Sequence, residues 1–146
     1  MSTMAQFLRD EGYIVRNEDY PSRHKKIEEL AGPAVEDGLD YCRKEGATSI
    51  HFVTHSLGGI LVRFYLESHK VPELGRVVML APPNQGSKVV DKFSGMPAYR
   101  FINGPAGYQL GTDENSIPLQ LGPADFEVGI IAGDYTVNLI LSTAFD

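Results

Sequence analysis

The chain contains a single cysteine, Cys42, so it cannot form an internal disulfide bond. Cys42 falls within a helical pattern of apolar residues, and we expect a buried or half-buried thiol rather than a catalytic one. No apolar run approaches the ~20 residues that span a bilayer. The first residues also lack the basic start and long apolar core of a secretory signal. We therefore expect a cytoplasmic protein without an integral membrane segment.

Positive charge is scarce as well, because 13 Lys and Arg residues stand against 19 Asp and Glu residues, for a formal net charge of −6. Nucleic acids are bound by concentrated positive charge, so this balance argues against a nucleic-acid partner. The histidines share no metal-ligand spacing with carboxylates or with the cysteine, and we expect no metal ion or other cofactor. A length of 146 residues fits one domain, spanning 1–146.

The most informative stretch runs from Ile50 to Gly59. It begins with four β-prone residues, continues through a glycine-flanked serine, Ser56, and leads directly into the apolar helical pattern of Ile60 to Leu66. A serine in such a setting matches the nucleophile elbow, G-x-S-x-G, in which a strained backbone lifts the hydroxyl above the sheet edge. Here Gly58 keeps the second glycine and Thr54 replaces the first.

Three stretches together resemble the bacterial lipase and esterase branch of the α/β-hydrolases. After the elbow, an apolar strand leads into Ala81 to Ser87, APPNQGS, which looks like the PPNQGS segment of those enzymes. Upstream, Gly12 to Val15 followed by Tyr20 to Ser22 is similar to their strand that enters the long helix before the elbow. The similarity covers roughly Met4 to Asn138.

This resemblance implies a serine hydrolase of the lipase or esterase type, acting on carboxylic esters with Ser56 as the nucleophile. The backbone N–H of Leu57 would supply one oxyanion donor at the start of the helix. The family order of the catalytic triad is serine, acid, histidine, whereas no histidine follows His69 in this chain. The general base is therefore the open question.

Four histidines are candidates for the base. We choose His24, because it follows a predicted strand whose carboxyl end should lie on the active-site side. His55 is the variable residue before the serine, and its ring is expected to point away from the hydroxyl. His51 is expected to be a hydrogen-bonded core residue, and His69 to interact with the end of its helix.

The candidate acid is Asp134, which follows the last predicted strand. An ordinary turn at Gly133-Asp134 explains the same residues, so both interpretations stay open.

The expected fold class is α/β: a partial α/β-hydrolase, a three-layer sandwich with a short, mostly parallel sheet flanked by helices. The predicted helices are 3–11, 24–45, with a cap at Ser22 and a kink near Pro33, and 58–70. The predicted strands are 13–17, 50–53, 76–80 and 128–132. The glycine- and proline-rich stretch 95–123 is expected to be a lid-like loop region, and 137–145 a short apolar tail.

The segments that carry the second oxyanion donor, the acid and the histidine in those enzymes have no evident counterpart here. We therefore expect the chain to correspond to a truncated domain with exposed sheet edges, which invite pairing into a homo-oligomer. One alternative stays open: a non-catalytic module of the same fold that binds a lipid or protein partner without turnover.

Overall fold

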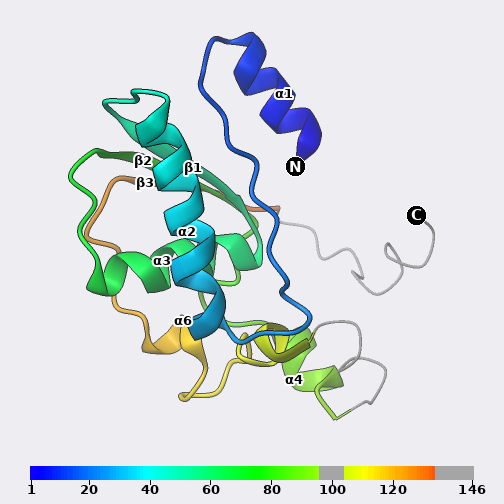
Figure 1. Ribbon diagram of the computed structural model, residues 1–146. Helices are drawn as coiled ribbons and strands as arrows, with labels where there is room; N and C mark the ends of the chain where they lie inside the picture. The colour runs from blue at the N-terminus through cyan, green and yellow to red at the C-terminus, as the bar shows by residue number, and fades with distance from the viewer. Residues whose placement is uncertain (96–103, 134–146) are drawn as a thin grey trace.

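The computed structural model describes residues 1–95 and 104–133 and has a small α/β fold (Figure 1). Its strands form one parallel sheet in the order β1-β2-β3. The elements in chain order are α1 (Ser2–Asp10), α2 (Ile27–Lys44), β1 (Ile50–His55), α3 (Leu57–Ser68), β2 (Leu74–Leu80), α4 (Lys88–Phe93), α6 (Ile117–Gln120) and β3 (Val128–Ile131). The expected α/β class with a short parallel sheet is confirmed.

The sheet buries one face more than the other. Thr54 of β1 pairs in register with Met79 of β2, and both side chains are buried. His55, which follows Thr54, is exposed, and Val78 and Leu80, which flank Met79, are partly exposed, as expected when successive residues of a strand point to opposite faces. The core joins the sheet to α2 and α3, which pack against each other, and α2 crosses in front of α3 in Figure 1.

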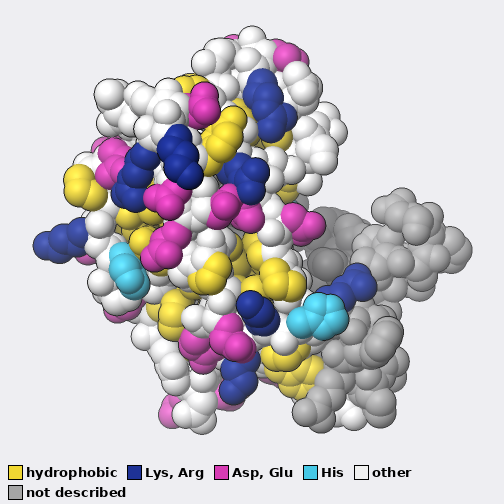
Figure 2. All heavy atoms as spheres, viewed as in Figure 1, with side chains coloured by type: hydrophobic (Ala, Val, Ile, Leu, Met, Phe, Trp, Pro, Cys, Tyr) yellow, Lys and Arg dark blue, Asp and Glu magenta, His cyan; other side chains and the backbone are white. Residues whose placement is uncertain are grey.

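The long helix α2 buries one face and exposes the other. Ile27, Leu30, Ala31, Val35 and Leu39 are buried, which is the spacing of a single helical stripe. Figure 2 shows acidic and basic side chains interspersed over the visible face of the molecule. No helix in the described residues is long and apolar enough to cross a membrane.

Two predictions about the start of α2 need correction. The helix begins at Ile27, and Lys26 rather than Ser22 occupies the N-cap. Lys26 donates its backbone N–H to the Glu29 carboxylate at 3.0 Å, and the Gln109 side-chain oxygen accepts the Ile27 N–H at 2.7 Å. A distant glutamine therefore completes the cap, which local sequence rules do not reveal.

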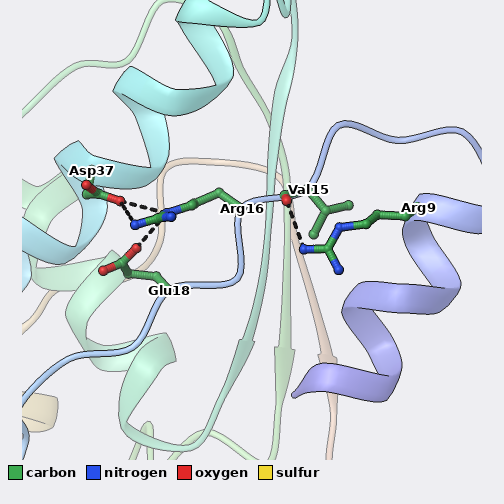
Figure 3. Close-up of polar contacts among 5 residues, drawn as sticks. All are labelled: Arg9, Val15, Arg16, Glu18 and Asp37. Atoms are coloured by element: carbon green, nitrogen blue, oxygen red, sulfur yellow. Dashed lines mark hydrogen bonds and ion pairs between the residues drawn. The ribbon is translucent and has the colours of Figure 1, made fainter.

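The strand predicted at 13–17 is wrong, because residues 13–20 are extended but belong to no strand. β-prone residues form a strand only where a neighbouring strand supplies partners, and Tyr13 is 57% exposed here. Side chains hold this segment instead (Figure 3). Arg9 donates to the Val15 carbonyl at 3.2 Å, and Arg16 pairs with Glu18 and with Asp37 of α2.

Described residues of the 95–123 stretch contribute to the core. Residues 104–108 are helical, and Ala106, Leu110 and Ile117 are buried. The backbones at Gly86 and Gly111 pass close to each other, and the Ser87 N–H donates to the Leu110 carbonyl at 2.8 Å. The predicted apolar tail, 137–145, lies outside the described residues.

Candidate active site

Ser56 occupies a strained turn between β1 and α3. Its backbone has φ 50° and ψ −121°, which a residue with a side chain rarely adopts. Conformations of this kind cost about 1–3 kcal/mol and persist only where the surrounding structure enforces them. One such restraint is the bond from the Ser56 N–H to the Leu80 carbonyl at 2.9 Å, which fixes the turn to the end of β2.

The two glycines after the serine allow α3 to pack closely against its surroundings. A Cβ atom at Gly59 would lie 3.3 Å from both the Met79 sulfur and Pro82 Cβ. A Cβ atom at Gly58 would lie 3.3 Å from the Tyr20 hydroxyl oxygen. Thr54, in the place of the first glycine of the motif, fits because its side chain is buried and its hydroxyl lies 3.4 Å from the Val78 carbonyl.

Leu57 is the first residue of α3. The first N–H groups of a helix have no partner within the helix, and they carry its partial positive charge. The N–H of Leu57 therefore has no acceptor within the helix, and its role as an oxyanion donor stays a prediction. Leu57 and Ser56 are both half-buried.

The four histidines differ in their surroundings. His24 is exposed in the turn before α2, where its N–H donates to the Pro21 carbonyl at 3.0 Å. No hydrogen bond of its ring is found among the described residues. The role of His24 as the base stays a prediction.

Two other histidines have structural partners. His51 is exposed, not a core residue as expected, but its Nδ1 accepts the Arg76 N–H at 2.8 Å, where the β1–β2 register shifts. The His69 ring stacks on Tyr65 at 4.3 Å, and its Nδ1 lies 3.0 Å from the Tyr65 carbonyl at the end of α3. The expected association of His69 with its helix terminus is confirmed. His55 is exposed.

The candidate acid, Asp134, lies outside the described residues. Its neighbour Gly133 is exposed, two residues after the end of β3.

Arg63 joins α3 to the loop that follows β2. Its guanidinium donates to the Asn84 side-chain oxygen at 2.9 Å and to the carbonyls of Leu121 and Gly122 at 3.2 and 3.0 Å. Burial lowers the pKa of Arg63 below its ordinary value. The sequence analysis missed this contact, although an arginine within an otherwise apolar helix is a signal that it has buried partners.

No group of three or more His, Cys, Asp or Glu side chains that could hold a metal ion occurs within residues 1–95 and 104–133. Cys42 is half-buried, as expected, and burial raises the pKa of its thiol.

No protein-family model and no curated protein matches the chain. The class that the structure defines is a small α/β protein with a parallel sheet and a strained serine between a strand and a helix.

Proposed function

We propose that the chain is a serine hydrolase of the lipase or esterase type, which acts on carboxylic esters through Ser56. The observation that carries the proposal is the backbone of Ser56, with φ 50° at a half-buried serine directly before a helix. Backbone strain in proteins clusters at active sites, where it orients a reacting group. The glycines, the strand and the helix around this serine are the context that a nucleophile elbow requires.

The chemistry follows from the serine and the helix start. The Ser56 oxygen bonds to the ester carbonyl carbon, its proton passes to a general base, and a carbonyl electron pair moves to the oxygen. The N–H of Leu57 donates to this oxyanion. When the carbonyl re-forms, the alkoxide leaves with the proton from the base, and water then cleaves the acyl-enzyme by the same steps. We propose His24 as the base and Asp134 as the acid that orients it.

The proposal is tested by intact mass spectrometry after treatment with a fluorophosphonate. This reagent phosphonylates an activated serine whatever acyl chain the natural ester has. We expect one adduct on the wild-type chain and none on Ser56→Ala. The matched control is Ser68→Ala, because Ser68 lies at the end of the same helix with its hydroxyl 3.0 Å from His69 Nδ1. This variant should be labelled at the wild-type rate.

Two results would contradict the proposal. A folded wild-type chain that is not labelled would favour the alternative of a binding module without turnover. Labelling that persists in Ser56→Ala but disappears in Ser68→Ala would identify Ser68, at the other end of α3, as the activated serine. Slower labelling of His24→Gln, by contrast, would support His24 as the base.

We also propose that the chain forms a homo-oligomer through its sheet edges. Within the described residues β1 and β3 each pair only with β2, so each has one outer edge without a partner strand. Large apolar side chains accompany the β3 edge, since Ile130 and Ile131 are 55% and 64% exposed. An exposed apolar edge strand is a ready partner for another strand.

A further inference from the structure

Tyr20 reaches the candidate active site from a distant part of the chain. It ends the extended segment 13–20, and its ring packs against the core. Its hydroxyl oxygen lies 3.3 Å from the position that a Cβ atom would take at Gly58. Because Gly58 is the second residue of α3, this hydroxyl lies near the first turn of the helix.

The Tyr20 hydroxyl is available as a donor. It has no hydrogen-bond partner among residues 1–95 and 104–133 and is not fully buried, so a bound molecule can reach it. Burial raises the pKa of Tyr20, and the charge of Asp19 raises it further. The hydroxyl therefore keeps its proton at neutral pH.

The segment that carries Tyr20 is tied to α2 close to this position. Arg16 pairs with Asp37 through Nη2 at 2.7 Å and with Glu18 through Nε at 3.0 Å, and Figure 3 shows both pairs. The Arg16 guanidinium also lies 5.8 Å from the ring centre of Tyr41. These contacts fix the backbone four residues before Tyr20 and limit the positions that its hydroxyl can take.

We propose that Tyr20 is the second oxyanion donor of this site, acting together with the N–H of Leu57. An acyl-transfer site needs two or more donors aimed at the oxygen that becomes negative, and the helix start supplies one of them. The Tyr20 O–H donates to that oxygen and keeps its proton, so no further proton transfer is involved. This inference rests on the proposed ester hydrolysis at Ser56.

The test compares Tyr20→Phe with Tyr13→Phe. Both variants lose one tyrosine hydroxyl from the same segment, but Tyr13 is 57% exposed. The readouts are the rate of fluorophosphonate labelling at Ser56 and the kcat and KM for p-nitrophenyl acetate. For Tyr20→Phe we expect labelling and kcat to fall by about 10²–10³, the effect of losing one oxyanion donor, with KM little changed. Tyr13→Phe should behave as wild type.

The outcomes separate this inference from the proposed function. Labelling of the wild-type chain at Ser56, with Tyr20→Phe labelled at the same rate, would overturn the role of Tyr20 and leave the hydrolase intact. A wild-type chain that is not labelled at all would overturn both. Folding is checked by the urea midpoint, which should match wild type because the hydroxyl has no partner to lose among the described residues.

Discussion

At the scale of the residue, Ser56 and Tyr20 are positioned by different contacts: Ser56 by its neighbours in the chain, and Tyr20 by packing between distant segments. The strained turn at Ser56 follows from its immediate neighbours: a β-prone run before it and glycines after it. Tyr20 gave no comparable signal, because it approaches Gly58 only when distant segments pack together. The position of Arg63 in an apolar helix indicated buried partners but not which ones. Motif spacing along the chain contains no information about which side chain will lie near the start of α3.

Two glycines, Gly46 and Gly86, allow a prediction about stability at the same scale. Gly86 and Gly46 both have positive φ, 75° and 82°. A Cβ atom at Gly86 would lie only 2.0 Å from the Gly111 carbonyl oxygen, whereas nothing lies within 4 Å of one at Gly46. Gly46→Ala should therefore cost about 1 kcal/mol of unfolding free energy, for the backbone conformation alone. Gly86→Ala should cost at least twice as much, because the crossing backbones must also separate.

Urea denaturation of the two variants provides the measurement, with the unfolding free energy extrapolated to water. Equal losses in Gly46→Ala and Gly86→Ala would show that the approach of Gly86 to Gly111 does not constrain the fold.

At the scale of the element, the helices and strands that bury a continuous apolar face are predicted from the sequence. The apolar stripe of α2 and the apolar runs of β1 and β2 predict their elements to within a few residues. Residues 13–17 have the same β-prone character, yet form no strand, because no strand in the described part of the chain lies beside them to accept their hydrogen bonds. The short helices α4 and α6 were missed, since four to six residues are too few for a helical period to be recognised.

The junction between α4 and the loop at 112 should depend on pH. Asp91 accepts hydrogen bonds from the Thr112 hydroxyl and, at 3.0 Å, from its N–H. These bonds, the hydroxyl first, lower the pKa of Asp91 below its ordinary value. A carboxylate with a lowered pKa in the folded state stabilises the fold above its unfolded pKa of about 3.9. The contribution is lost as the pH falls through the folded pKa.

Asp91→Asn should therefore lower Tm at pH 7, and the difference from wild type should shrink as the pH is lowered below 4. Thermal unfolding by circular dichroism across this range is the measurement. Glu114→Gln, which also neutralises an exposed carboxylate near Thr112, is the control and should leave Tm nearly unchanged. A Tm difference for Asp91→Asn that stays constant from pH 7 to pH 3 would mean that the charge of Asp91 does not stabilise the junction.

At the scale of the whole molecule, part of the apolar surface of the sheet is left uncovered at β3. Parallel strands are normally covered on both faces, yet every residue of β3 is exposed. The apolar runs of the sequence predict which strands form but say nothing about what covers the outermost strand. A second copy of the chain would supply both a neighbouring strand and apolar surface.

The β3 edge allows a specific test of this assembly. The carbonyls of Glu127 and Ile131 accept hydrogen bonds from Val77 of β2 and from Ala81, which directly follows β2, at 2.9 and 2.8 Å. Backbone groups alternate in direction along a parallel strand, so the N–H of Ile130 points toward the outer edge. Ile130→Pro removes this donor without removing a bond to β2. Ile130→Ala removes the apolar side chain and keeps the donor, so it separates strand pairing from simple hydrophobic contact.

We expect light scattering to give a dimer or larger assembly for the wild-type chain at high concentration, and a monomer for Ile130→Pro. Ile130→Ala should associate more weakly than wild type but should not be monomeric, because the edge still offers its N–H and carbonyl groups to a neighbouring strand. A wild-type chain that stays monomeric at high concentration would refute assembly through the sheet edges. Equal dissociation of both variants would instead assign the contact to the Ile130 side chain, since only Ile130→Pro loses the backbone donor.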